Sequence, residues 1–437
     1  MVFKKSLFQV ESDVGKRMHE LIGELYPICR SITGHGVRET LSIIAKHIPC
    51  ETVEVPTGTK VFDWTVPKEW NISDAYIKNA KGEKIVDFKN SNLHVLGYSK
   101  PVQGTVSLGE LKKHLFTIPE HPQSIPYRTS YYNEDWGFCL SHNQYLELTD
   151  DRYEVLINAS LEEGCLSYGQ CVLRGETEQE VLLSCHICHP SLCNDNLSGI
   201  ALTVFLAKHL CQTSTRYTYR FLFVPATIGS ITWLALHDSS LPDIRHGLVA
   251  ANLGDSGNFT YKKSRQGNAE IDHAVANVLA GSGFGYKIID FSPYGYDERQ
   301  YCSPGFNLPL GCLMRTPHGE YPEYHTSADD LDFVKPENLA DSFSIYASVL
   351  NVLENNRVYI NQNPKCEPQL GKRGLYDKIG GDSDSKAKQM ALLWTLNLSD
   401  GGYSLLDISN RSGIAFPLIK NAADSLTENG LLKEAGE

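Results

Sequence analysis

Apolar positions near the start of the chain recur at helical spacing. Between Asp13 and Ile28 they fall on one face, which predicts a helix, and a second helix is expected from Val37 to His47. Over residues 51–159 this period gives way to short runs such as TKVFDWTV, which are rich in β-branched and aromatic residues. Such runs are typical of short strands, so this segment is predicted to be a β-rich inserted module.

From about residue 160, apolar runs of strand length alternate with helical patterns. Strands are expected at 180–185, 220–226 and 246–255, and helices at 197–210, 230–238 and 336–353. Continuous apolar strands that alternate with helices indicate a largely parallel sheet with both faces covered. Residues 1–50 and 160–360 are therefore predicted to form an α/β domain with a mixed, mostly parallel sheet covered by helices.

The end of the chain has a pattern of its own. Residues 355–374 are expected to be a linker, and residues 375–437 a winged helix of three short helices and a small terminal strand. From Gly371 onward, acidic residues outnumber basic ones. A domain that reads a DNA groove normally carries a positive face, so a protein-contact or dimerisation module is favoured.

Composition limits the classes of function. The formal charge of −12 argues against nucleic acid as a partner, since a phosphate backbone is repelled overall. We find no membrane-length apolar run and no secretory signal at the start. The 12 cysteines are scattered, which favours reduced thiols over a disulfide framework. These features predict a cytoplasmic location.

The stretch SCHICHPSLCNDNLSG, residues 184–199, carries the densest chemistry. A structural zinc site offers its ligands in two close pairs, and no second CxxC pair follows here, so a structural zinc site is disfavoured. Instead, His186 is expected at the end of a strand and Asp195 at the start of a helix, where small residues let that helix begin close to the sheet. A carboxylate so placed can bridge two metal ions while the imidazole binds one of them.

Other strand ends offer further metal ligands. Asp255 follows the third predicted strand, and His325 lies in the loop EYPEYHTSADD. Taken alone, Asp255 is more typical of a turn and His325 of a surface histidine. Because ligands bind beyond the carboxyl ends of strands in such sheets, the residues together predict a metal site. His189 is an alternative ligand, since a short loop can present either histidine.

The order of His186, Asp195, NLGD at 252–255 and YHTSADD at 324–330 resembles the zinc-dependent exopeptidases of the leucyl aminopeptidase and glutamate carboxypeptidase type, the MH clan. The chain more closely resembles a bacterial aminopeptidase-like family often encoded among polysaccharide-biosynthesis genes. The closer likeness covers nearly the whole chain and is carried by HICHPSLCNDNLSG, TIGSI, DERQYCSPG and LMRTPHGEYPEYHTSADDL.

This resemblance implies a zinc-exopeptidase fold with one or two zinc ions, although manganese or cobalt would also fit. His186 and Asp255 would hold one ion and His325 the other, with Asp195 bridging them.

Two departures concern the chemistry. Cys188 stands where the aminopeptidases have an aspartate, and Ala226 and Thr227 stand where they have paired glutamates, one of which is the general base and the other a metal ligand. Proton transfer to the leaving amine then needs a group from another loop. The candidates are Glu323, Glu320 and Glu298. Solvated side chains or ion pairs with Arg299 or Arg315 are the ordinary alternative for these glutamates.

These features together predict a metal-dependent amide hydrolase of the aminopeptidase type. Its substrate would be a small peptide, or an aminoacyl or acylamino group on a sugar, and Arg299 and Arg315 could clamp a carboxylate or phosphate. The alternative is a catalytically impaired, metal- or ligand-binding pseudoenzyme whose winged helix mediates protein contacts. A homo-oligomer or a protein partner through the winged helix fits either hypothesis.

Overall fold

The computed structural model describes residues 11–375 and 383–436. These residues form two compact units. The larger unit contains residues 11–267 and 287–343, and the smaller unit contains residues 268–286 together with the described residues from 344 onward. No helix of the described residues combines the length and apolar character needed to span a bilayer. All the cysteines are free thiols.

An eight-stranded sheet, in the order β1-β10-β12-β11-β13-β16-β14-β15, forms the centre of the α/β domain. The pairs β12–β11, β11–β13 and β13–β16 are parallel, whereas β1, β10 and β14 pair antiparallel. The expected mixed sheet is therefore confirmed, and its parallel pairs lie at the centre of the strand order. The strands are β1 (Glu51–Pro56), β10 (Cys165–Leu173), β11 (Glu180–His186), β12 (Thr218–Val224), β13 (Ile244–Ala250), β14 (Phe259–Lys262), β15 (Tyr286–Ile289) and β16 (Leu310–Met314).

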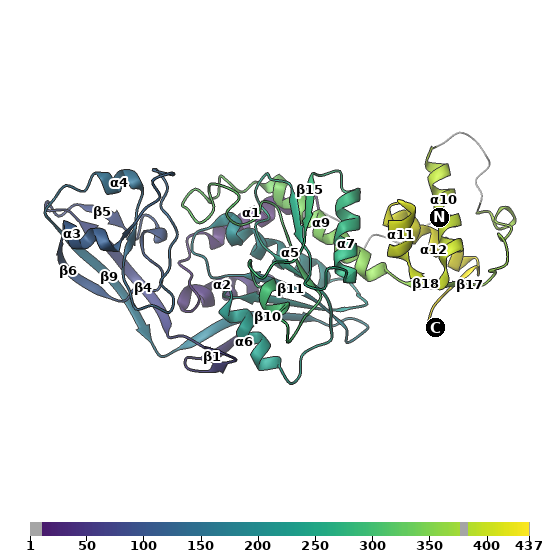
Figure 1. Ribbon diagram of the computed structural model, residues 1–437, viewed down its shortest axis with the longest axis horizontal. Helices are drawn as coiled ribbons and strands as arrows, with labels where there is room; N and C mark the ends of the chain where they lie inside the picture. The colour runs from purple at the N-terminus through teal and green to yellow at the C-terminus, as the bar shows by residue number, and fades with distance from the viewer. Residues whose placement is uncertain (1–10, 376–382, 437) are drawn as a thin grey trace. The chain divides into compact units, whose positions relative to one another are not determined.

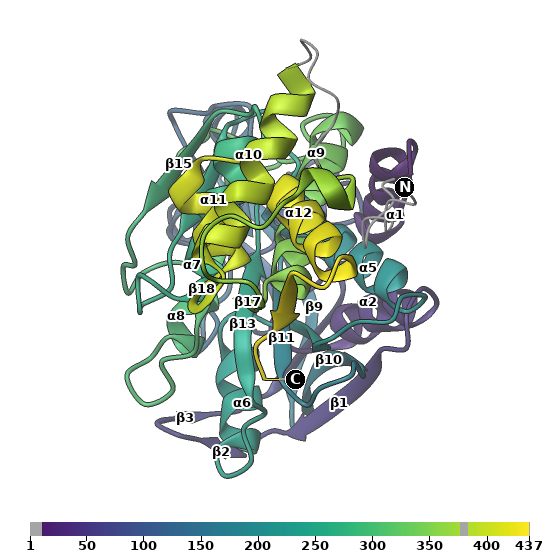
Figure 2. The ribbon, with the colours of Figure 1, turned by 90° about the vertical axis from the view of Figure 1, so that its right-hand side faces the viewer.

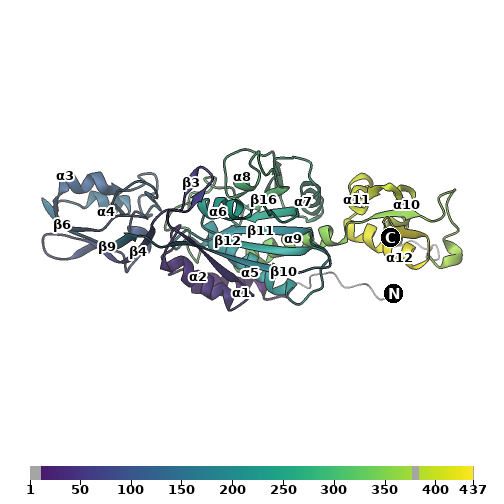
Figure 3. The same cartoon turned by 90° about the horizontal axis from the view of Figure 1, so that it is seen from below.

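Helices cover both faces of this sheet, as Figure 3 shows. One face carries α1 (Val14–Leu25), α2 (His35–Ala45) and α5 (Ser198–Leu210), and the other carries α6 (Ile228–His237) and α8 (Glu298–Tyr301). The long helix α9 (Pro336–Asn355) follows the expected range. Helix α1 buries the apolar face that its spacing predicted, and nearly every residue of α5 is buried, as expected for a helix that is apolar all round.

The predicted β-rich module contains a four-stranded antiparallel sheet in the order β5-β4-β9-β6 (Figure 1). Its strands are β4 (Glu69–Lys78), β5 (Lys84–Asp87), β6 (Val102–Ser107) and β9 (Arg152–Glu162), accompanied by the short elements β2 (Lys60–Val61), β3 (Trp64–Thr65), β7 (Leu115–Phe116), β8 (Phe138–Cys139), α3 (Leu108–Leu111) and α4 (His142–Leu146). The expected start at residue 51 needs correction. Residues 51–56 form β1, which pairs with β10 as an edge strand of the main sheet.

Helix α5 begins very close to the main sheet at Gly199. A Cβ atom there would lie 2.5 Å from the carbonyl oxygen of Ala250 and 2.4 Å from Oδ1 of Asn196. We expect Gly199→Ala to lower the free energy of unfolding by about 1–3 kcal/mol, because a buried backbone oxygen has no room to move aside. Chemical denaturation should show a lower midpoint. Gly109→Ala in α3, where no atom lies within 4 Å, is the matched control, and equal midpoints for both variants would contradict the prediction.

The smaller unit holds the winged-helix elements, which Figure 2 shows together. Its helices are α7 (Glu270–Gly281), α10 (Ser383–Leu398), α11 (Leu405–Ser412) and α12 (Phe416–Glu428), and its three-stranded sheet has the order β18-β17-β19, with β17 (Val358–Asn361), β18 (Asp400–Ser404) and β19 (Leu432–Glu434).

The expected linker at 355–374 needs correction, because it contains β17, the central strand of this sheet. The module therefore begins before residue 375, while residues 376–382 and 437 of the predicted range lie outside the described residues. On α12, Nζ of Lys420 pairs with Asp424 at 2.6 Å.

Candidate functional site

Three histidines and one aspartate meet beyond the carboxyl end of β11. His186 is the last residue of that strand, and its Nε2 lies 2.8 Å from Oδ1 of Asp195. Nε2 of His325 lies 2.9 Å from the other oxygen, Oδ2, of the same carboxylate. Nδ1 of His189 lies 3.8 Å from Oδ1, and one nitrogen from each of His186 and His189 and one oxygen of Asp195 all lie within 4.8 Å of one another. Four predicted metal ligands are thus brought together.

Asp329 fixes the turn that carries Asp195 through hydrogen bonds to its backbone. The carboxylate of Asp329 accepts the backbone N–H groups of Asn194 at 2.6 Å and Asp195 at 3.0 Å, and its carbonyl oxygen accepts the N–H of Cys193 at 3.0 Å. Burial raises the pKa of Asp329 to about 8. The amide of Asn196 donates to the carbonyl of Ala250 at 2.9 Å, which ties the same turn to the end of β13. These bonds fix the direction in which the Asp195 carboxylate points.

The backbones of the other two loops are also held by hydrogen bonds. Nε of the buried Arg30 donates to the carbonyl of His189 at 2.9 Å, and the backbone N–H of Tyr127 donates to the carbonyl of His325 at 2.7 Å. His325 has a φ of +54°, a left-handed conformation that costs a non-glycine residue free energy and recurs at functional sites. The ring of Tyr127 meets both imidazoles edge-on, with centroids 5.1 Å apart. A loop of the β-rich module therefore takes part in the site.

The charge at the centre of this cluster is deeply buried. The side chain of Asp195 is 0% exposed. Burial by itself raises its pKa, but His189, His186 and His325 together hold the pKa well below its usual range. Burial lowers the pKa of His189 well below 6.5, and its Nδ1 is buried without a hydrogen-bond partner. The cluster is thus an ionised carboxylate among imidazole nitrogens, one of which, Nδ1 of His189, makes no hydrogen bond among the described residues.

The cysteines of the same stretch do not join the cluster. Cys185, Cys188 and Cys193 are buried, and burial raises the pKa of the Cys188 thiol to about 12 and those of the other two further. A thiol ligates metal as the thiolate, which these environments disfavour. Sγ of Cys188 faces the carbonyl of Ala226 at 3.9 Å instead.

The structure corrects the expectation that Asp255 is a metal ligand. Its Oδ1 accepts hydrogen bonds from Oγ1 of Thr316 at 2.6 Å and the N–H of Gly257 at 2.7 Å, and its Oδ2 accepts one from Nδ2 of Asn194 at 3.0 Å. Asn252 is closer to the end of β13, and its Nδ2 donates to the hydroxyl of Tyr296 at 2.7 Å. The strand end therefore offers a neutral amide where the sequence suggested a carboxylate.

The expected general bases also need correction. Glu298 pairs with Nζ of Lys262 at 2.7 Å, and Glu320 pairs with Nζ of Lys287 at 2.8 Å. Neither of them, nor Glu323, lines the cavity above the cluster. The alternative of ion pairs is thus what the structure shows for Glu298 and Glu320, although with lysines and not with the arginines considered.

Arg315 is not available as a clamp. Its guanidinium is buried and donates to Oγ of Ser342 at 3.1 Å, to the carbonyl of Gly257 at 2.9 Å and to that of Asn338 at 3.0 Å. Arg299, the other predicted clamp, lines the cavity.

A cavity of about 460 Å³ opens over the cluster and has mainly aromatic walls. His186, His189 and His325 lie in its lining. Apart from imidazoles, its charged side chains are Arg128 and Arg299, and no Asp or Glu of the described residues belongs to its lining. The aromatic residues of the walls are Trp64, Tyr127, Tyr131, Tyr132, Tyr294, Tyr296, His318 and Tyr324.

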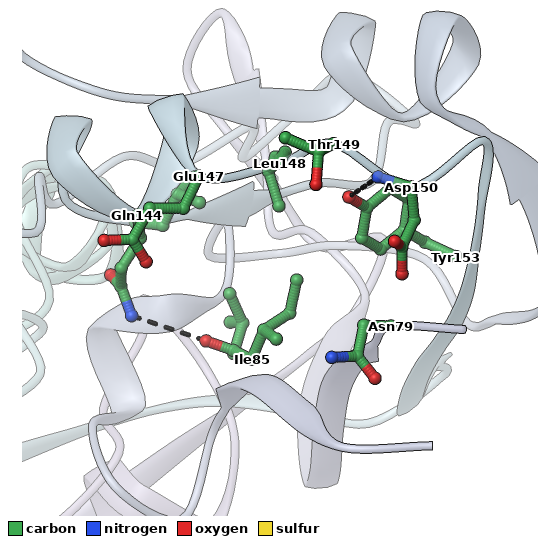
Figure 4. Close-up of a pocket in the computed structure, with 10 residues that line it drawn as sticks. Asn79, Ile85, Gln144, Glu147, Leu148, Thr149, Asp150 and Tyr153 are labelled. Atoms are coloured by element: carbon green, nitrogen blue, oxygen red, sulfur yellow. Dashed lines mark hydrogen bonds between the residues drawn. The ribbon is translucent and has the colours of Figure 1, made fainter. Parts of the chain in front are cut away.

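A second cavity, of about 360 Å³, lies in the β-rich module (Figure 4). The backbone N–H of Asp150 donates to the hydroxyl of Tyr153 at 2.9 Å, and Nε2 of Gln144 donates to the carbonyl of Ile85 at 3.4 Å. None of the described residues that line it is a histidine or a cysteine. The histidines gather at the first cavity, which is the candidate site.

Comparison with protein families matches two successive parts of the chain. Residues 19–356 match the family described as "Domain of unknown function (DUF4910)". The chain belongs to the DUF4910 family. Residues 357–434 match a winged helix-turn-helix family, which confirms the predicted C-terminal module.

Two relatives from Clostridium acetobutylicum cover nearly the whole chain. A protein of Clostridium acetobutylicum named "Putative polysaccharide biosynthesis protein with aminopeptidase-like domain" is 56% identical over 97% of this chain and 98% of its own length. A crystal structure described as a putative peptidase from the same organism has a TM-score of 0.93, with 55% identity and 97% of each chain covered.

More distant structures share the fold alone. A zinc aminopeptidase of Bacillus subtilis, BSAP, matches with a TM-score of 0.55 at 11% identity, over 78% of this chain and 95% of its own. A peptidase M28 precursor of Shewanella amazonensis matches with a TM-score of 0.55 at 13% identity, over the same shares of the two chains. The expected aminopeptidase-like fold is confirmed.

Proposed function

We propose that this DUF4910 protein is a metal-dependent hydrolase of amide bonds, with one divalent ion held by His186, His189, Asp195 and His325. The proposal rests on the convergence of these side chains on the Asp195 carboxylate at the floor of the cavity. Imidazoles with one carboxylate suit zinc, and manganese or cobalt would also fit.

Two observations indicate that these residues suit a divalent ion. A buried carboxylate is costly unless it is paired, and the groups nearest to Asp195 are imidazoles, whose own buried environment favours the neutral form for His189. Nδ1 of His189 is buried with no partner, although buried polar atoms normally have one. A cation between these groups would satisfy both requirements.

The set of available metal ligands favours one bound ion over two. A second ion needs further anionic ligands, but Thr227 and Asn252 occupy the ends of the neighbouring strands β12 and β13 and carry no charge. Asp255 already accepts four hydrogen bonds. One carboxylate does not balance the charge of two divalent ions in a buried site.

When bound, the ion would polarise an amide carbonyl and make water more acidic. The residues of the chain then have to move the proton. His318 lines the cavity, is only partly buried, and has an Nδ1 without a hydrogen-bond partner. Burial lowers its pKa below 6.5, so the neutral imidazole prevails at neutral pH and can accept a proton. We assign this role to His318 in place of the glutamates.

The proposed substrate is a small peptide, or an aminoacyl or acylamino group on a sugar. The name of the Clostridium relative refers to polysaccharide biosynthesis, and aromatic walls present apolar faces with polar hydroxyls. These observations favour the sugar-linked amide. The winged-helix module is proposed to contact a protein partner or a second copy of the chain.

Metal stoichiometry tests the proposal. Mass spectrometry of the zinc-loaded protein should find one equivalent, and His189→Ala and His325→Ala should both lose it, because each removes a ligand of a shared ion. His273→Ala, on an exposed position of α7, should keep it. Two equivalents, or none after reconstitution, would contradict a single-ion centre. A full equivalent without release of amine from any acylated peptide or acylamino sugar would instead support the pseudoenzyme hypothesis.

A further inference from the structure

The charged groups around the cavity are of one sign. Arg128 and Arg299 belong to its lining, and no acidic side chain of the described residues does. Asp195 lies beneath the histidines at 0% exposure, where the imidazoles bind both of its oxygens. A molecule that enters the cavity therefore meets guanidinium groups before any carboxylate.

Arg299 has one buried donor, Nε, that the protein leaves without an acceptor among the described residues. It lies in α8, is partly buried, and its Nε is buried with no hydrogen-bond partner. No carboxylate of residues 11–375 and 383–436 forms an ion pair with it. A buried donor without an acceptor costs free energy, whereas a guanidinium fork matches a carboxylate or phosphate with two parallel hydrogen bonds.

The neighbouring charges do not neutralise Arg299. Glu298 pairs with Lys262 at 2.7 Å, so these two groups compensate each other. Burial raises the pKa of Asp297 to about 6, and its Oδ1 accepts a hydrogen bond from Oγ of Ser230 at 2.7 Å, so this carboxyl is bound by Ser230 and forms no ion pair with Arg299 among the described residues. Asp297 does not line the cavity.

We infer that the cavity recognises its amide substrate by an anionic group, a carboxylate or a phosphate, bound to Arg299 with Arg128, and that it excludes a free amino terminus. The amide itself rests on the proposed function. An ammonium group would be repelled by both guanidinium groups and by a divalent ion, and it would find no carboxylate in the lining to accept its protons. An acylated substrate has no such charge.

Calorimetric titration of the full-length protein tests this inference with three probes. N-acetyl-L-tyrosine carries a carboxylate, N-acetylglucosamine 1-phosphate carries a phosphate, and L-tyrosinamide carries an ammonium group on the same aromatic frame as the first probe. We expect at least one anion to bind about tenfold or more tightly than L-tyrosinamide, and the tighter anion identifies the source of the charge. Arg299→Gln should weaken that anion by about 10- to 100-fold.

The controls separate this inference from the metal centre. Each titration is repeated after EDTA treatment, where anion binding that depends on Arg299 should persist. Arg174→Gln, at an exposed arginine paired with Glu178 outside the cavity, should bind like the wild type. Arg128→Gln is a second variant at an exposed position, in case Arg299→Gln disturbs folding. L-tyrosinamide binding as tightly as both anions, or wild-type anion affinity in both arginine variants, would overturn the inference. Failure of the single-ion hydrolase would appear in zinc content and amine release, while the EDTA-treated titrations would stay unchanged.

Discussion

Replacing Asp195 with asparagine is expected to lower the affinity for zinc by more than about 100-fold and to abolish amide hydrolysis. Asp195 supplies the one carboxylate of the cluster, and both of its oxygens are directed at histidine nitrogens. Substitution of groups that merely orient a ligand costs about 10- to 100-fold in metal affinity, so loss of a charged ligand should exceed that range. Competition with a fluorescent zinc chelator measures the affinity, and detection of released amine measures the hydrolysis.

Asp290→Asn is the matched control, because Asp290 is 89% exposed and pairs with Lys263 away from the cavity. This variant should keep the zinc affinity and the activity of the wild type. Circular dichroism of Asp195→Asn would show whether its fold is retained. If a folded Asp195→Asn bound zinc as tightly as the wild type, Asp195 would not be a ligand and the site would lie elsewhere.

Much of the α/β domain could be predicted because its signals are local. The strand expected at 180–185 is β11, which is buried throughout, and the helix expected from 197 is α5. The prediction that His186 and Asp195 lie together follows from the strand and helix that carry them. The addition of His325 depended on the rule that loops at the carboxyl ends of parallel strands converge, and β11, β13 and β16 are indeed parallel neighbours.

The errors come from contacts between residues that are distant in the chain. The prediction that Glu298 is a general base failed because Glu298 pairs with Lys262 of β14. No spacing in the sequence indicates that ion pair. Strand β17 was taken for a linker because its partners, β18 and β19, follow only after a helix or more. Tyr127 was missed because it belongs to the β-rich module, yet its loop contacts His325.

The position of Asp255 could not be predicted for a different reason. Strand β13 ends at Ala250, and Asn252 then adopts a left-handed φ of +50°. Asp255 follows this turn, and its carboxylate accepts hydrogen bonds from Thr316, Gly257 and Asn194. The sequence could predict a polar residue after the strand, but not the hydrogen-bond partners that the fold brings to Asp255 and Asn252.

His318→Gln is expected to lower kcat by about 10²- to 10⁴-fold while the zinc content stays at the wild-type level. His318 lines the cavity, and its Nδ1 has no hydrogen-bond partner. Its ring packs edge-on against Tyr294 and Tyr296, with centroids 5.4 Å from each, which holds the imidazole in place. It is not one of the proposed ligands, so only proton transfer should suffer. Steady-state kinetics on the acylated substrate that the wild type cleaves, with zinc content measured in parallel, checks this expectation.

The pH profile separates proton transfer from a structural role of His318. A base works in its deprotonated form, and burial lowers the pKa of His318 below 6.5, so wild-type kcat should rise as the pH increases through a value below 6.5 and then level off. His318→Gln should lack this acid limb, and added imidazole should restore part of the rate. His142→Gln, in α4 and outside the cavity lining, should keep the wild-type profile. An acid limb that persists unchanged in His318→Gln would show that another group accepts the proton. His318 would then serve only as part of the aromatic wall of the cavity.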